Sequence, residues 1–186
     1  MTMMLTEENG VYQFDCSKAL WATSEIRDQY FNARIHVLKN ADFIIETNDE
    51  LLIVEYKNST ISSAVKPQAF NPVDDKLKDD LARKFYDSLH YLQLRDKRKP
   101  KHYIVIIEAD GSDRAMRLRL RDRVMKELPF ALQNNMDTGI RMLDECQVFS
   151  IAEWNAHPKY GLYPCTPVCG PDSVNASHTH PKINQN

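Results

Sequence analysis

The apolar and polar positions of the chain follow two different periods. Runs in which apolar residues alternate with polar ones, or follow one another directly, predict strands at residues 11–16, 42–47, 51–57, 102–108 and 147–151. Apolar residues at helical spacing predict one long helix, with a stripe formed by Leu77, Leu81, Phe85, Leu89 and Leu92. Strands and helices therefore alternate along the chain, which indicates an α/β protein with a mixed sheet.

Capping residues and weaker periodicities add three further segments. Ser112 is expected to cap a helix that runs to about residue 128. Ser150 and Glu153 resemble a capping box that opens a short helix. Residues 17–37 are ambiguous, because the spacing of their apolar side chains is only roughly helical.

The composition limits the classes of protein to which the chain can belong. With 186 residues, 42% of them hydrophobic, the chain is long enough for one domain with its own core. No run approaches the roughly 18–20 apolar residues of a membrane helix. The first residues are acidic where a signal peptide has lysines. We therefore expect a cytoplasmic protein that has no membrane partner.

The C-terminal residues differ in composition from the rest of the chain. Residues 1–163 are expected to form a single α/β domain, and residues 164–186, rich in Pro, Ser and Asn, a loosely structured tail. Four side chains of this tail could in principle bind zinc, namely Cys165, Cys169, His178 and His180. Their spacing fits no common zinc finger, which favours the loosely structured tail.

The hairpin between the second and third predicted strands carries the candidate chemistry. If residues 48–49 form a two-residue turn, Asp42 lies directly opposite Glu55. Alternation along the strand then places Lys57 on the same face as both carboxylates, and Tyr56 on the other face. Two carboxylates and one ammonium group are therefore expected to converge at the open end of this hairpin.

Such a group of charges suits a divalent cation. Two facing carboxylates repel each other unless a cation lies between them. Mg²⁺ or Mn²⁺ takes oxygen ligands, and Mg²⁺ often has only one or two protein carboxylates among them. A bound ion can lower the pKa of a water molecule and neutralise charge on a reacting phosphate. With Lys57 orienting the water or stabilising the transition state, the combination indicates hydrolysis of a phosphodiester bond.

The chain resembles the PD-(D/E)xK motif of the restriction-endonuclease-like nuclease superfamily. The resemblance lies in Asp42 and in Glu55-Tyr56-Lys57, which follows after twelve residues. The resemblance implies an αβββαβ core with a central mixed sheet flanked by helices, similar to the element order expected from residue 17 to residue 108. It also implies that Asp42, Glu55 and the Tyr56 backbone carbonyl bind the metal ion and that Lys57 assists the chemistry. Within the superfamily, the chain looks like uncharacterised bacterial members, which implies no particular substrate.

Two features depart from the pattern of the superfamily. Ala41 stands where a proline is often found, which leaves the metal ligands unchanged. Many members also contribute an acidic residue from the first core helix. Glu25 is the best-placed candidate for this further metal ligand, and Glu7 or Glu8 is the alternative. The number of metal ions therefore stays open.

Charge is distributed unevenly along the chain. The formal net charge is −2, but residues 1–60 carry a net charge of −5 and residues 95–126 a net charge of +6. The basic side chains that we expect to contact the phosphates of a nucleic acid are Lys97, Lys99, Arg114, Arg117 and Arg121. The alternative is an ordinary solvated helix face preceded by a solubilising connector.

The sequence thus predicts a nuclease-like α/β domain that hydrolyses DNA or RNA with Mg²⁺ or Mn²⁺. An alternative from another class is a catalytically inactive nucleic-acid-binding or protein-interaction module on the same fold. A homo-oligomer, such as a homodimer, with the basic helix at its interface is a third interpretation that the sequence leaves open.

Overall fold

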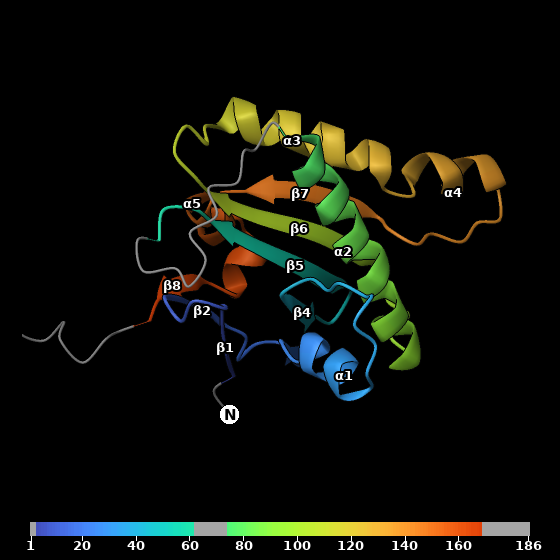
Figure 1. Cartoon of the computed structure of the whole chain (residues 1–186), viewed down its shortest axis with the longest axis horizontal. Coiled ribbons are helices and arrows are strands. Elements are labelled where there is room, and N and C mark those ends of the chain that lie inside the picture. Colours follow the sequence, from blue (N-terminus) through green and yellow to red (C-terminus); the bar gives the residue numbers. More distant parts are fainter. Residues whose placement is uncertain (1–2, 62–73, 169–186) are drawn as a thin grey trace, which may run out of the picture.

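A five-stranded mixed sheet forms the centre of the structure (Figure 1). The computed structural model describes residues 3–61 and 74–168. The strands lie in the order β3-β4-β5-β6-β7, with bounds Trp21–Thr23, Phe43–Glu46, Leu51–Asn58, Lys101–Glu108 and Glu145–Phe149. β3, β4 and β5 pair antiparallel, whereas β5, β6 and β7 pair parallel. The prediction of an α/β protein with a mixed sheet is therefore confirmed.

Helices cover one face of this sheet (Figure 1). They are α1 (Ile26–Asn32), α2 (Asp75–Leu94) and α3 (Arg114–Glu127), and α4 (Phe130–Met136) follows α3. The core on this face brings Ile53 of β5 together with Leu81 and Phe85 of α2, all fully buried. Asp74 caps α2 by accepting a hydrogen bond from the Lys76 amide. Among the described residues, no helix combines the length and the apolar character needed to cross a membrane.

A second sheet and α5 cover the opposite face. The second sheet has the order β1-β2-β8, with bounds Met4–Thr6, Tyr12–Asp15 and Cys165–Pro167. α5 spans Ile151–Ala156, and a 3₁₀ turn, η1, spans Tyr160–Leu162. The ring of Phe14 lies 4.8 Å from that of Phe43 and 5.9 Å from that of Trp154, and all three are buried. Side chains alternate along β4 and β5, so these two strands contribute residues to the core under the helices and to the core under the second sheet.

Local signals place most of the elements, and the structure corrects others. Residues 17–37 hold two elements, because β3 pairs with β4 at the sheet edge before α1 begins. The cap of α3 is Asp113, whose side chain accepts a hydrogen bond from the Met116 amide, and not Ser112. The capping box of Ser150 and Glu153 at α5 is confirmed.

The first residues of the predicted tail are part of the folded domain. Cys165 is buried, and β8 pairs antiparallel with β2, so residues 165–167 belong to the second sheet. This strand has no alternating pattern of its own and depends on β2 for its hydrogen bonds. Cys169, His178 and His180 lie outside the described residues.

Candidate functional site

The hairpin of β4 and β5 has the register that the two-residue turn predicts. The Thr47 amide donates to the Glu50 carbonyl at 2.9 Å, and Phe43 pairs with Val54. Asp42, directly before β4, therefore lies beside Glu55 and Tyr56. Its Oδ2 atom accepts a hydrogen bond of 2.8 Å from the Tyr56 amide, which fixes the carboxylate against β5.

α2 holds the other side of Asp42. The Ala41 amide donates to Ser88 Oγ at 2.9 Å, and the Lys39 amide donates to Asp87 Oδ2 at 2.8 Å. Ser88 is fully buried, so the segment that leads into β4 is attached to the helix from within the core. Asp42 is thus positioned by both the sheet and α2.

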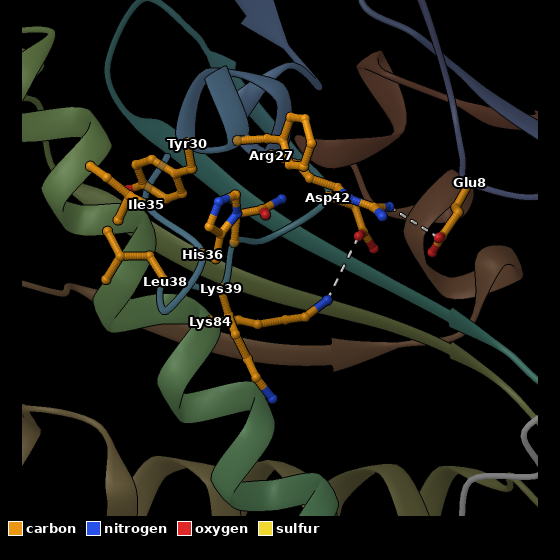
Figure 2. A pocket seen from close by; sticks show the side chains of 11 residues that line it. Glu8, Arg27, Tyr30, Ile35, His36, Leu38, Lys39, Asp42 and Lys84 are labelled. Carbon is orange, nitrogen blue, oxygen red and sulfur yellow. Dashed lines mark hydrogen bonds and ion pairs between the residues drawn. The ribbon is translucent and has the colours of Figure 1, made fainter. Parts of the chain in front are cut away.

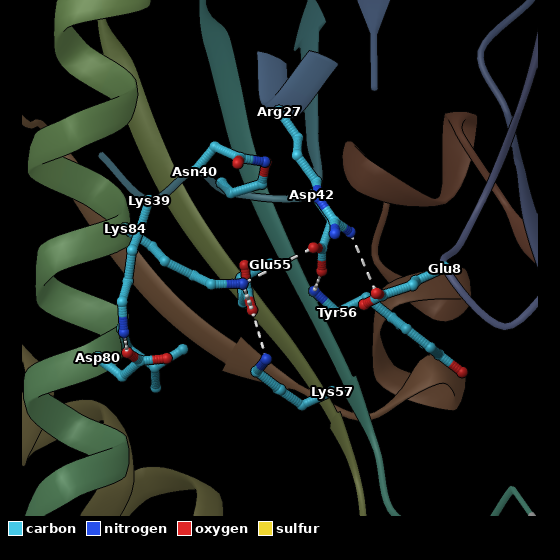
Figure 3. A network of polar contacts seen from close by, with 12 residues as sticks. Glu8, Arg27, Lys39, Asn40, Asp42, Glu55, Tyr56, Lys57, Asp80 and Lys84 are labelled. Atoms are coloured by element: carbon cyan, nitrogen blue, oxygen red, sulfur yellow. Dashed lines mark hydrogen bonds and ion pairs between the residues drawn. The ribbon is translucent and has the colours of Figure 1, made fainter. Parts of the chain in front are cut away.

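The structure brings Asp42, Glu55 and Lys57 together and adds Lys84 of α2 to them (Figure 3). Lys57 Nζ lies 2.9 Å from Glu55 Oε1. Lys84 Nζ lies 2.6 Å from the same Glu55 oxygen and 3.8 Å from Asp42 Oδ1. One ammonium group therefore lies within ion-pair distance of both carboxylates.

The position of Lys84 in the sequence indicates a buried partner, although Lys84 is not part of the apolar stripe. It stands three residues after Leu81 and seven after Leu77, on the face of the helix that is otherwise apolar. Ser88, four residues later, lies on that face too. Polar residues on the buried face of an amphipathic helix require partners inside the protein, and here these partners are the carboxylates and the segment before β4.

Burial and the neighbouring charges shift the pKa values of Asp42 and Lys84. Burial, and then the charge of Glu55, raise the pKa of Asp42 to about 7, although Lys84, Lys57 and the Tyr56 amide act against this rise. Burial lowers the pKa of Lys84, but the charges of Glu55 and Asp42 outweigh burial and raise it above its ordinary value. The positive charge of Lys84 is therefore retained at all physiological pH values, whereas Asp42 titrates near neutrality.

Glu55 is completely buried, and one of its carboxylate oxygens has no hydrogen-bond partner among the described residues. Its side chain is 0% exposed, and both lysines contact Oε1. Oε2 is buried and has no hydrogen-bond partner among the described residues. An oxygen of a buried carboxylate without a partner is costly, which makes it a candidate ligand for a cation.

Of the three acidic residues expected as a further metal ligand, Glu8 lines the same cavity as Asp42. Glu25 is exposed at the start of α1 and does not line the cavity beside Asp42, whereas Glu8 does. Glu7 is buried, and its carboxylate accepts hydrogen bonds from the amides of Asn9 and Val11 within the turn between β1 and β2. Glu8 therefore has the best access to the site of the three.

The candidate metal ligands form a pair of carboxylates. In residues 3–61 and 74–168, no three side chains of His, Cys, Asp or Glu are grouped so that they could hold a metal ion. The unpartnered Glu55 Oε2 and the partly exposed Asp42 fit an ion that takes its remaining ligands from water and substrate. The Tyr56 carbonyl points to the same neighbouring strand as the Tyr56 amide, and hence toward the Asp42 side.

The basic residues expected to bind phosphate do not form one exposed surface. Arg117 is buried, and its Nε and Nη2 atoms contact the two carboxylate oxygens of Glu153 at 2.8 and 2.9 Å. Lys97 and Lys99 both form ion pairs with Glu46 at the other end of the hairpin. Arg117, which we expected to contact phosphate, instead lies beside the buried Leu120 and Val124 on α3.

Arg114 and Arg121 are the accessible members of the predicted set on α3. Arg114 is exposed, and Arg121, partly exposed, pairs with the neighbouring Asp122 at 2.8 Å. An ion pair between adjacent surface residues contributes little to stability.

No protein-family model, curated protein sequence or solved structure matches this chain.

Proposed function

We propose that the protein is a metal-dependent phosphodiesterase that cleaves DNA or RNA. The observation that carries the proposal is the group formed by Asp42, Glu55, Lys57 and Lys84, in which a fully buried carboxylate keeps one oxygen without a partner. Buried ion pairs contribute little to stability on balance, and apolar residues of similar size often replace them without loss. A costly group of this composition beside an accessible cavity indicates a functional site.

The fold supports the proposal in a general way. From β3 to β6 the elements follow the order βαββαβ, with Asp42 before the second strand and Glu55 and Lys57 on the third. The restriction-endonuclease-like core has the order αβββαβ, so here the first helix follows the first strand instead of preceding it. The likeness therefore rests on the hairpin with its carboxylates and on the parallel strand that follows α2.

The residues of the site divide the chemistry among them. Asp42 and Glu55 would hold Mg²⁺ or Mn²⁺, which supplies an activated water and neutralises charge on the phosphate when bound. Lys57 is 27% exposed, so its ammonium group can reach a phosphate or a water molecule outside the core. Lys84 contacts the same oxygen of Glu55 from α2 and holds the carboxylate in place. Lys57 therefore acts on the substrate, and Lys84 positions the carboxylates.

The position of Lys84 also favours a second candidate function. Lys84 already lies between the two carboxylates, and together with Lys57 it balances their charge. A protein that needs no cation at this position can keep the fold as a nucleic-acid-binding module without activity. Such a protein neither cleaves nucleic acid nor gains stability from Mg²⁺.

The proposal is tested by incubating plasmid and oligonucleotide substrates with the full chain, in Mg²⁺, in Mn²⁺ and in EDTA. Cleavage is expected only with a metal ion, and Glu55→Gln or Lys57→Met is expected to reduce its rate at least about 100-fold. Glu46→Gln is the matched control, since Glu46 lies at the opposite end of the same hairpin. Full activity of Glu55→Gln, or cleavage in EDTA, would contradict the proposal.

A further inference from the structure

A cavity opens directly beside the candidate site (Figure 2). Its volume is about 330 Å³, and its walls come from the turn between β1 and β2, from α1 and the segment after it, and from α2. Asp42 and Lys84 belong both to this cavity and to the candidate site. A molecule in the cavity therefore lies within reach of the proposed chemistry.

The walls of the cavity differ in character. Tyr30, Ile35 and Leu38 gather on one side, and Asp42, with Lys84 pointing toward it, lies on another (Figure 2). Phe31 and His36 also line the cavity, with their ring centroids 5.4 Å apart. The cavity thus offers aromatic and apolar surface next to charged groups, which is the combination that a nucleotide requires.

Phe31 is unusual in its exposure. It lies on α1 next to Tyr30, whose ring is buried and whose hydroxyl donates to the Asp87 carbonyl at 2.7 Å. Tyr30 therefore anchors the helix, whereas 66% of the surface of Phe31 stays accessible. A large aromatic side chain that lines a cavity and is not needed for the core is suited to stack on a ligand ring.

Cationic side chains stand at the same cavity. Arg27 pairs with Glu8 at 3.2 Å, and both side chains are more than 70% exposed. Such a pair is weak, so the guanidinium group can turn to a phosphate at little cost. Lys39 also lines the cavity and is partly exposed, with Asp80 as its partner. Phosphates on either side of a bound base therefore have cations within reach.

We propose that this cavity binds one unpaired nucleotide of a single-stranded nucleic acid, with its base stacked on Phe31. The inference rests on the proposed function for the identity of the ligand as a nucleic acid. A cavity of about 330 Å³ lies at the small end of the range for ligand sites and accommodates one nucleotide rather than a duplex. Bases in a duplex are already stacked and paired, so only an unpaired or extruded base can enter a protein cavity. The substrate class is therefore a single strand, an overhang or a flap.

Binding is measured by fluorescence anisotropy with labelled oligonucleotides in EDTA, so that no cleavage occurs. The probes are 20-nucleotide strands of dT and of rU, a 20-base-pair duplex, and a strand of the same length made of abasic sites. The abasic strand keeps the phosphates and removes the bases, and thus separates stacking from electrostatic attraction. The dT and rU probes distinguish DNA from RNA.

The wild-type protein is expected to bind dT or rU more tightly than the duplex and the abasic strand. Phe31→Ala should weaken binding of the single strand roughly 5- to 100-fold, in line with the loss of one base–aromatic stack. It should leave the abasic strand unaffected, and Phe31→Trp should retain the affinity for bases. Leu94→Ala is the matched control, because Leu94 is also a highly exposed apolar residue but does not line the cavity.

Equal affinity of wild type and Phe31→Ala for dT and rU would overturn the inference. Equal affinity of the wild type for the abasic and the normal strands would overturn it too. Neither result affects the proposed function, which depends on metal-dependent cleavage and on Glu55. Conversely, a protein that binds bases as expected and yet cleaves no substrate would contradict the proposed nuclease activity. This result would support the cavity as a single-strand binding site.

Discussion

Replacement of Asp42 by asparagine is expected to stabilise the fold at pH 8 although it removes a residue of the proposed site. Asparagine has the shape of the protonated carboxyl group, and its side-chain oxygen can still accept the hydrogen bond from the Tyr56 amide. It cannot carry the negative charge that burial and Glu55 make unfavourable. The substitution thus removes a penalty that the wild-type protein bears whenever Asp42 is ionised.

The size of the effect follows from the pKa of Asp42. A rise from 3.8 to about 7 in the folded state corresponds to about 4 kcal/mol of stability lost on ionisation, at about 1.4 kcal/mol per unit. The side chain is 28% exposed, and solvent screens part of this energy, so about 2 kcal/mol is a more realistic figure. For a protein of this size, 2 kcal/mol corresponds to a rise in Tm of about 4–8 °C.

The dependence on pH has a definite sign. Between pH 4 and pH 7 the folded protein holds a proton on Asp42 that the unfolded chain has released, because the folded-state pKa is the higher one. The contribution of Asp42 to stability is therefore fully present below about pH 4 and is lost as the pH rises through 7. Asp42→Asn lacks this loss, so the difference in Tm between variant and wild type should grow from pH 4 to pH 8.

The measurement is calorimetric unfolding of both proteins at several pH values in EDTA. Asp80→Asn is the matched control on the neighbouring helix. Burial acts to raise the pKa of Asp80, but the hydrogen bond and the charge of Lys39, together with the charges of Lys84 and Lys57, outweigh burial and lower the pKa. This control should therefore be less stable than the wild type at pH 8, by up to about 1 kcal/mol. The reasoning is refuted if Asp42→Asn has the same Tm as the wild type, or a lower one, at pH 8.

Two further substitutions test other contacts. Lys84→Met leaves the buried Glu55 with one cation, so we expect a loss of about 3 kcal/mol at pH 8, partly restored by Mg²⁺. An unchanged Tm would show that Lys84 does not neutralise the site. Arg117→Met removes the paired contact with Glu153 and should lower the free energy of unfolding in urea by about 2 kcal/mol. The salt dependence of oligonucleotide binding should stay the same, and a weaker salt dependence would place Arg117 at a phosphate.

The hairpin could be predicted from sequence because its determinants are local. A two-residue turn and the alternation of β4 and β5 are enough to place Asp42 beside Glu55. β3 and β8 could not be found in the same way, since each has three residues and owes its conformation to hydrogen bonds with a strand elsewhere in the chain. Their pairing is a property of the assembled sheets.

The positions of the charged residues show a similar division. The spacing of Lys84 and Arg117 places both on the buried sides of their helices, so the sequence contains the information that they need internal partners. The partners themselves, Glu55 and Glu153, are 29 and 36 residues away. No periodicity relates such pairs, because the packing of the helices around the sheet decides them.

The pairing of β8 with β2 has a consequence for the order in which the molecule is assembled. The sheet that contains residues 12–14 is complete only when residues 165–167 have paired with them. The Val168 amide also donates a hydrogen bond to the Val11 carbonyl, at the turn that carries Glu8. During synthesis, the wall of the cavity next to Asp42 thus becomes complete only after β7 and α5 have emerged. Closure over such a sequence distance is slow compared with the formation of the hairpin. In a nascent chain, the hairpin that holds Asp42 and Glu55 is therefore expected to form before the wall of the cavity is complete.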